Sequence, residues 1–203
     1  VKRLNEAQQS AYDQILFQFF KKDVVLLHGV TSSGKTEIYI HLIKKVLEEK
    51  KQVLYLLPEI ALTVQITSRL HHVFGNQLGI YHSKYSDAER VEIWKKQLSS
   101  NPYNVVLGAR SAVFLPFSRL GLVIIDEEHE TSFKQQDPSP RYHARSVAIV
   151  LANMYKAKVL LGTATPSMES YYNAEQGKYG LVTLNTRYKD IELPEINVVD
   201  TKD

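Results

Sequence analysis

The chain alternates between short apolar runs and longer segments with helical apolar spacing. The runs have the length and residue types of buried strands, and we predict strands at Val24–Leu27, Gln52–Leu57, Gly79–Ser83, Asn104–Leu107, Leu120–Ile125 and Val159–Leu161. Helical spacing predicts helices that open at Leu4–Gln8 and that span Glu37–Glu49, Thr63–Phe74, Asp87–Leu98 and Ser146–Met154. Strands that alternate with helices predict an α/β fold.

This pattern of strands and helices predicts the limits of a single domain. Val159–Leu161 is the last core strand that we predict, because the sequence becomes Tyr-rich and then polar after residue 168. We therefore expect a single lobe over residues 1–190 and a linker over 191–203, in which 192–196 forms a strand or leaves the domain. Because residue 1 is Val and not Met, we also expect the chain to be a piece of a longer protein.

Composition narrows the class of protein. Of the 203 residues, 44% are hydrophobic and 23% are charged, which is ordinary for a globular domain. The net charge of +3 is a mild preference for polyanions. No apolar run is long enough to span a membrane, no signal peptide is recognisable, and there is no cysteine. We therefore expect a cytoplasmic protein with no disulfide and no membrane partner.

The strongest chemical signal directly follows the first strand. Gly29 and Gly34 bound a loop that ends in Lys35-Thr36 and leads into a helix, the order of a phosphate-binding loop. The backbone N–H groups of the loop can surround an anion, Lys35 can neutralise the β- and γ-phosphates of ATP, and Thr36 can bind Mg²⁺. The expected nucleotide contacts are Gly29, Val30, Thr31, Ser32, Ser33, Gly34, Lys35 and Thr36. A glycine-rich turn with a solvated lysine is the alternative.

The second signal is a pair of acids at the tip of the strand at 120–125. Asp126 is expected to hold Mg²⁺ directly or through water, and Glu127 is expected to orient and deprotonate the attacking water. A solvated acidic turn is the alternative, but acids directly after a buried-type strand and downstream of a phosphate loop favour metal-assisted hydrolysis.

Weaker signals predict further contacts with nucleotide and DNA. The amide of Gln8 can donate to and accept from an adenine edge at once, and an exposed helix glutamine is the alternative. Arg110 follows a strand end, where an arginine can contact a phosphate backbone or remain solvated. The loop at 133–145 interleaves aromatic and basic residues, which suits base stacking and phosphate contact, or else is a mobile surface loop. Its basic residues include Lys134, Arg141 and Arg145.

Three residues near the ends of the last two strands are candidates for communication between sites. We predict that His129 hydrogen-bonds to a hydroxyl of Thr163 or Thr165 and senses whether the third phosphate is present. The state would then pass to Arg110 and to the loop that bears Lys134 and Arg145. A polar contact with only a packing role is the alternative.

Taken together these motifs resemble those of a known family. Gly29–Thr36, Asp126–His129 and Gly162–Thr165, in this order, resemble motifs I, II and III of superfamily 2 helicases of the DEEH kind. Further segments resemble the PriA family of primosomal replication-restart helicases, and Leu4–Gln8 matches the adenine-side motif; the segments are Leu57–Thr63, Gly108–Phe117, Lys134-Gln135 and Arg141–Arg145. Two positions depart from that family, since Ser32 replaces a Gly and Ala109 replaces a Ser.

The resemblance implies the first of two RecA-like lobes of a P-loop NTPase, with a mostly parallel central sheet flanked by helices. It implies an ATP- and Mg²⁺-dependent DNA helicase that moves 3′→5′ on single-stranded DNA and unwinds stalled forks. Expected partners are forked DNA, primosome proteins and single-strand-binding proteins. Zinc is expected only in the region of the absent second lobe, and the isolated lobe should not hydrolyse ATP because that second lobe supplies a charge-stabilising arginine. A P-loop kinase and a non-catalytic ATP-dependent scaffold are the competing hypotheses.

Overall fold

The computed structural model describes residues 1–30, 34–136 and 141–185. Its centre is a seven-stranded sheet in the order β3-β4-β2-β5-β6-β1-β7, in which every paired neighbour is parallel. The strands are β1 (Val24–Gly29), β2 (Gln52–Leu56), β3 (Leu78–Tyr81), β4 (Val105–Gly108), β5 (Leu120–Asp126), β6 (Lys158–Thr163) and β7 (Gly180–Leu184). The predicted mostly parallel α/β sheet is confirmed.

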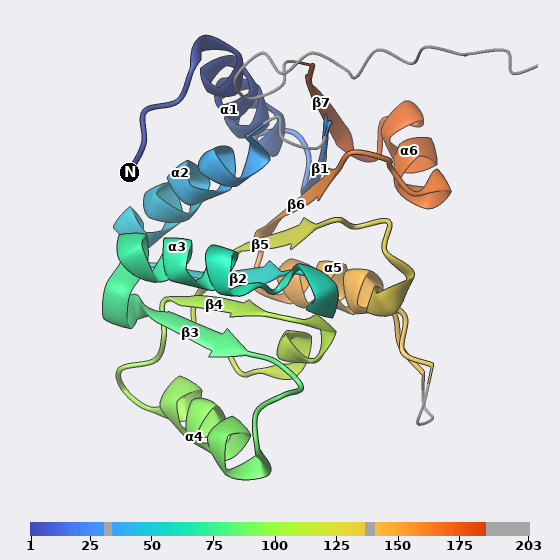
Figure 1. The fold of residues 1–203 in the computed structure, drawn as a ribbon. Helices are drawn as coiled ribbons and strands as arrows, with labels where there is room; N and C mark the ends of the chain where they lie inside the picture. The colour runs from blue at the N-terminus through green and yellow to red at the C-terminus, as the bar shows by residue number, and fades with distance from the viewer. Residues whose placement is uncertain (31–33, 137–140, 186–203) are drawn as a thin grey trace, which may run out of the picture.

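Helices cover both faces of the sheet (Figure 1). The helices α1 (Glu6–Phe19), α2 (Lys35–Glu48) and α3 (Val64–Phe74) contribute to one apolar cluster, and α4 (Asp87–Leu98), α5 (Ala144–Met154) and α6 (Met168–Glu175) line the other face. Alternate residues of one strand enter opposite clusters, Val25 and Leu27 on one face and Val24 and Leu26 on the other. Burial on both faces explains why the inner strands are continuous apolar runs.

Short 3₁₀ turns complete the connections at Glu59–Ala61, Gly75–Gln77, Arg110–Phe114 and Thr131–Phe133. Helix α1 begins where expected, because the Asn5 side chain accepts from the Gln8 N–H and the Gln8 side chain accepts from the Asn5 N–H. This reciprocal capping box satisfies two backbone donors at the helix end. None of the helices in the described ranges is long and apolar enough to cross a membrane.

The prediction that Val159–Leu161 is the last core strand is wrong. Helix α6 and strand β7 follow it, and β7 pairs in parallel with β1 at the edge of the sheet. Only alternate residues of β7 are buried, while Leu181 and Thr183 are exposed. An edge strand buried on one face has no continuous apolar run, so this segment resembled a polar tail. The expected linker at 191–203, with the candidate strand at 192–196, lies outside the described residues.

The topology brings the ends of several strands together. Strand β1 lies between β6 and β7, and the chain crosses over β6 and β5 to form β2 beyond them. In parallel sheets such a crossover leaves a crevice at the carboxyl ends of the strands, where ligands bind. Gly29, Asp126 and Thr163 are the last residues of β1, β5 and β6. The three main motifs therefore meet at the carboxyl ends of the strands, the edge of the sheet at which the proposed ligand site lies.

Candidate active site

The turn from β1 into α2 has the backbone of an anion site. Gly34 precedes α2 with φ 85° and ψ 25°, a left-handed conformation that favours glycine. No described side chain caps the amino end of α2, so its first N–H groups and the positive end of its dipole are available to an anion. The contacts expected of Thr31, Ser32 and Ser33 lie outside the described residues.

Lys35 lies under this turn and not in solvent. Only 7% of its surface is exposed, and its Nζ donates to the carbonyl oxygens of Gly29 at 2.7 Å and Val30 at 3.3 Å. Two neutral acceptors and the charge of nearby Asp126 only partly compensate a buried ammonium, which is most stable in direct contact with an opposite charge. A phosphate at the adjacent helix terminus would supply that charge, so Lys35 fits the predicted role better than the solvated alternative.

Asp126 lies at the end of β5 among groups that orient it. The Tyr39 hydroxyl donates to Asp126 Oδ1 at 2.8 Å. Burial raises the pKa of Asp126 to about 6, and the Tyr39 hydrogen bond and the Lys35 charge both act in the opposite direction. Burial and the Asp126 charge raise the pKa of Tyr39 well above its ordinary value, so the phenol is the donor. A cation beside Asp126 would favour its charged form.

Thr36 lies next to a second buried phenol. The Tyr55 hydroxyl is buried and has no hydrogen-bond partner among the described residues. Burial raises its pKa well above the ordinary value, and the Thr36 side chain is close enough to act in the opposite direction. One carboxylate, one hydroxyl and a nearby phosphate site match the way in which Mg²⁺ is usually held, through one or two carboxylates plus substrate phosphates and water. The residues at this edge therefore fit Mg²⁺-nucleotide.

Glu127 has an unusual backbone. Its φ of 53° places it in the left-handed region, which costs a non-glycine residue on the order of 1–3 kcal/mol and is most frequent at functional sites. Its carboxylate is half-exposed and lies 3.7 Å from His129 Nε2. The turn thus places a partly exposed carboxylate directly after Asp126 at the strand end, an arrangement that suits a base acting on water.

Gln8 is buried and contacts the phosphate turn. It is 1% exposed, its Oε1 accepts from the Asn5 N–H at 2.9 Å, and its Nε2 donates to the Gly34 carbonyl oxygen at 3.1 Å. The alternative of an exposed helix glutamine is therefore wrong. An amide has two donor hydrogens and two acceptor lone pairs, so these bonds leave capacity for one further donor and one further acceptor contact.

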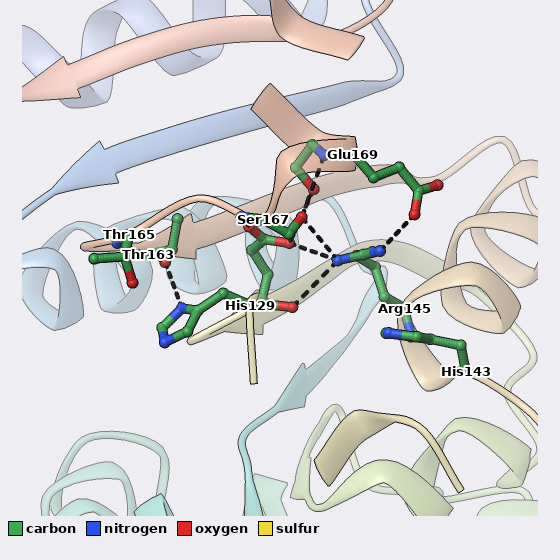
Figure 2. Close-up of polar contacts among 9 residues, drawn as sticks. His129, His143, Arg145, Thr163, Thr165, Ser167 and Glu169 are labelled. Carbon is green, nitrogen blue, oxygen red and sulfur yellow. Dashed lines mark hydrogen bonds and ion pairs between the residues drawn. The ribbon is translucent and has the colours of Figure 1, made fainter. Parts of the chain in front are cut away.

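His129 makes the predicted contact with a threonine hydroxyl. Its Nδ1 lies 2.7 Å from Thr163 Oγ1, and Figure 2 shows the imidazole turned toward Thr163. Thr165 contributes its backbone N–H, which donates to the same oxygen at 3.0 Å, while its side chain is exposed. Since that oxygen already accepts one proton, the Thr163 hydroxyl can donate to Nδ1 and leave the Nε2 proton toward Glu127.

A buried ion pair below this contact was not predicted. Glu128 is fully buried, and its carboxylate accepts from Arg145 Nη1 at 2.8 Å. It also accepts from the Ser167 N–H, the Ser167 hydroxyl and the Ser170 hydroxyl, at 2.7, 3.0 and 2.9 Å. These bonds join the turn after β5 to the start of α5 and to the turn before α6.

Arg145 therefore does not lie on the surface, where contact with DNA was expected. It is 6% exposed; its Nη1 donates to Glu128, and its Nη2 donates to Glu169 at 2.8 Å (Figure 2). The physical reason is Glu128, because a buried carboxylate requires a counter-charge. The signal available in the sequence was the extra acid in Asp126–His129, one more than the metal and the base require.

The remaining basic residues lie around one loop. Arg110 Nη1 donates to the Ser132 carbonyl oxygen at 3.0 Å, which ties the end of β4 to the turn after β5. Lys134 is exposed and forms an isolated antiparallel bridge with His143, and Arg141 is exposed as well. The Phe114 and Tyr142 rings pack edge to face at 4.8 Å. The base of the loop is thus joined by a backbone bridge, with the exposed Lys134 and Arg141 near its two ends.

Comparison with known proteins agrees with this geometry. The model of the DEAD/DEAH box helicase family matches residues 5–174. The chain belongs to the DEAD/DEAH box helicase family. Among kinds of P-loop protein, this match favours the helicase hypothesis over the kinase hypothesis, and the predicted fold class is confirmed.

Individual relatives show which proteins of this family the chain resembles. It is 44% identical over 202 residues to replication restart protein PriA of Bacillus subtilis, covering 98% of this chain and 25% of that protein. It is 45% identical over 199 residues to replication restart protein PriA of Haemophilus influenzae, covering 98% and 27%. The predicted resemblance to replication-restart helicases is confirmed, and the chain spans about a quarter of the length of these relatives.

Solved structures of DNA-bound proteins share the fold of this chain. RecG bound to a three-way DNA junction matches with a TM-score of 0.64 at 22% identity, over 91% of this chain and 24% of that one. The helicase MrfA bound to DNA and AMPPNP matches with a TM-score of 0.64 at 18% identity, over 92% and 27%. At these identities the likeness supports the architecture alone.

Proposed function

We propose that this chain is the ATP-binding motor lobe of a longer 3′→5′ DNA helicase that acts in replication restart at stalled forks. The observation that carries the proposal is the meeting of Lys35, Asp126 and Glu127 at one edge of a parallel sheet. The similarity to PriA proteins over nearly the whole chain supports the restart role. A lysine and two acids at one end of the sheet support nucleotide hydrolysis over the function of a non-catalytic scaffold.

ATP and Mg²⁺ are the proposed ligands. Lys35 and the amino end of α2 would bind the phosphates, Thr36 and Asp126 would hold the metal, and Gln8 would contact the base. When bound, Mg²⁺ would neutralise charge on the phosphates. Glu127 would orient a water molecule and accept its proton, since its carboxylate is partly exposed while the Asp126 carboxylate is held by the Tyr39 hydroxyl.

Single-stranded and forked DNA are the proposed substrates. Lys134 and Arg141 are exposed cations, Arg110 is tied to the neighbouring Ser132 carbonyl, and an aromatic pair lies close by, a combination that suits phosphate contact and base stacking. Arg145 would hold this loop against Glu128 and would not touch DNA. Primosome and single-strand-binding proteins, a further lobe with a zinc module, and a cytoplasmic location remain proposals drawn from the family resemblance.

In this proposal, His129 links the nucleotide site to the surface that contacts DNA. Its ring lies between Glu127 and Thr163, so a change at the third phosphate can reach the turn after β6. A residue that only links two sites contributes a coupling free energy and little to either affinity. We expect His129→Ala in the full-length protein to leave ATP affinity and DNA affinity within about twofold, and to reduce the stimulation of hydrolysis by DNA roughly 5- to 100-fold.

The measurement is the ratio of ATPase rates with and without single-stranded DNA. Wild type should show strong stimulation, which a small-molecule kinase would not. The matched control is His72→Ala, which removes an exposed histidine from α3 and should leave the ratio unchanged. An unchanged ratio in His129→Ala, with an unchanged melting temperature, would reduce His129 to a packing residue.

A further inference from the structure

Tyr39 has a buried hydroxyl group close to the candidate nucleotide site. It lies on α2, three residues after Thr36 and four after Lys35, and is therefore on the same side of the helix. The residue is fully buried, and its ring packs edge to face against Tyr55 at 5.6 Å. The ring alone would satisfy packing, so the hydroxyl requires its own explanation.

The hydroxyl is directed at a single acceptor. It lies 2.8 Å from Asp126 Oδ1, a charge-assisted contact of the kind that fixes the orientation of a carboxylate. Asp126 is the last residue of β5, and the Glu127 backbone N–H and the Lys35 charge also act on its carboxylate. Tyr39 therefore connects the first turns of the phosphate-binding helix to the acid that the proposed function gives to Mg²⁺.

Gly162 makes this contact possible. In the parallel pairing of β5 with β6, Gly162 lies opposite Asp126. A Cβ atom at Gly162 would lie 1.8 Å from the Tyr39 hydroxyl oxygen and 3.0 Å from Asp126 Oδ1. No side chain can occupy that space while the hydrogen bond exists. The glycine that begins the third motif is thus matched to a tyrosine three residues after the first motif.

We propose that Tyr39 is a positioning residue that orients the Asp126 carboxylate for Mg²⁺ and that Gly162 provides the space for its hydroxyl. This inference rests on the proposed nucleotide function and adds two residues to it. Groups that orient a metal ligand from behind typically contribute about 10- to 100-fold in metal affinity. Loss of the hydroxyl should therefore raise the Mg²⁺ concentration that the site requires. It should not change the affinity for nucleotide measured without Mg²⁺.

The test uses full-length protein and a non-hydrolysable ATP analogue. Its affinity is measured in EDTA and then at increasing Mg²⁺ concentration. In Tyr39→Phe the affinity in EDTA should stay within about twofold of wild type, while the Mg²⁺ concentration that gives half of the maximal enhancement should rise about 10- to 100-fold. Tyr81→Phe, which removes a hydroxyl from another buried tyrosine on β3, is the matched control and should match wild type.

A second variant separates orientation from general damage. Gly162→Ala should raise the Mg²⁺ requirement because its Cβ displaces the phenol, yet it should raise it no further when combined with Tyr39→Phe. Such non-additivity is expected of residues that act through one contact. If Tyr39→Phe does not fold, Gly162→Ala alone decides, and a wild-type Mg²⁺ requirement in it overturns the inference.

The outcomes distinguish this inference from the function on which it rests. Wild-type protein that binds no nucleotide would overturn both. Wild-type protein with normal Mg²⁺ enhancement, together with Tyr39→Phe showing the same enhancement, would overturn the role of Tyr39 and leave the proposed function intact. If Tyr39→Phe binds the ATP analogue more weakly than wild type by the same factor in EDTA and in Mg²⁺, the role of Tyr39 is also overturned. Such a result indicates structural damage without a metal-specific effect.

Discussion

Replacing Glu127 by glutamine in the full-length protein is expected to reduce ATP hydrolysis by about 10²- to 10⁴-fold while nucleotide still binds. Glutamine keeps the size and hydrogen-bonding capacity of the side chain but cannot accept the proton of water. Both residues experience the same strain at a φ of 53°, so the backbone contribution cancels in the comparison. The measurements are the steady-state ATPase rate with DNA and the affinity for a non-hydrolysable analogue.

The neighbouring acid supplies the control. Glu130 lies 3.7 Å from His129 Nε2, the same distance as Glu127, and has a similarly exposed side chain. Glu130→Gln therefore removes an equivalent charge from the same histidine and should hydrolyse ATP within about threefold of wild type. If Glu127→Gln hydrolyses ATP at the wild-type rate, another residue activates the water and the proposed mechanism is wrong.

Removing Arg145 is expected to be the most destabilising single change among the charged residues discussed. Arg145→Met would leave the Glu128 carboxylate fully buried with only the serine groups to compensate it. Breaking a buried ion pair in this way typically costs about 3–5 kcal/mol. The free energy of unfolding, measured by urea titration of this chain, should fall by that amount.

Two comparisons make this prediction specific. Lys158→Met breaks the exposed ion pair with Asp23 and should cost about 1 kcal/mol or less. Combining Arg145→Met with Glu128→Gln removes both charges and should recover a large part of the loss, because a buried pair contributes little net stability. A loss below about 1 kcal/mol in Arg145→Met, or no recovery in the double variant, would contradict the account of this network.

Local patterns were enough to predict the edge that carries the proposed chemistry. The apolar run at 24–27 and the glycines around it predict a buried strand and a phosphate turn, and both features depend on residues adjacent in sequence. The same holds for Asp126 at a strand end and for the helix that opens at Leu4–Gln8, which Asn5 caps. Each of these signals acts over a few residues, the range in which sequence periodicity and capping are informative.

The features that were missed depend on tertiary pairing. Glu128 and Arg145 are 17 residues apart, and each resembles a solvated charge when only its neighbours in sequence are considered. The match between Tyr39 and Gly162 depends on how α2 lies against β6, which no local pattern specifies. Strand β7 was missed because one-sided burial at a sheet edge leaves too few consecutive apolar residues.

The most direct test of the central claim is nucleotide binding by this chain. The phosphate turn lies within it, and Lys35 is buried against two carbonyl oxygens. By titration calorimetry we expect Mg-ADP to bind, and Lys35→Ala to weaken binding more than tenfold, about 1.4 kcal/mol or more. Lys44→Ala, at an exposed position on the same helix, should bind as wild type does. Equal affinity of wild type and Lys35→Ala would contradict the assignment of this turn as the nucleotide site.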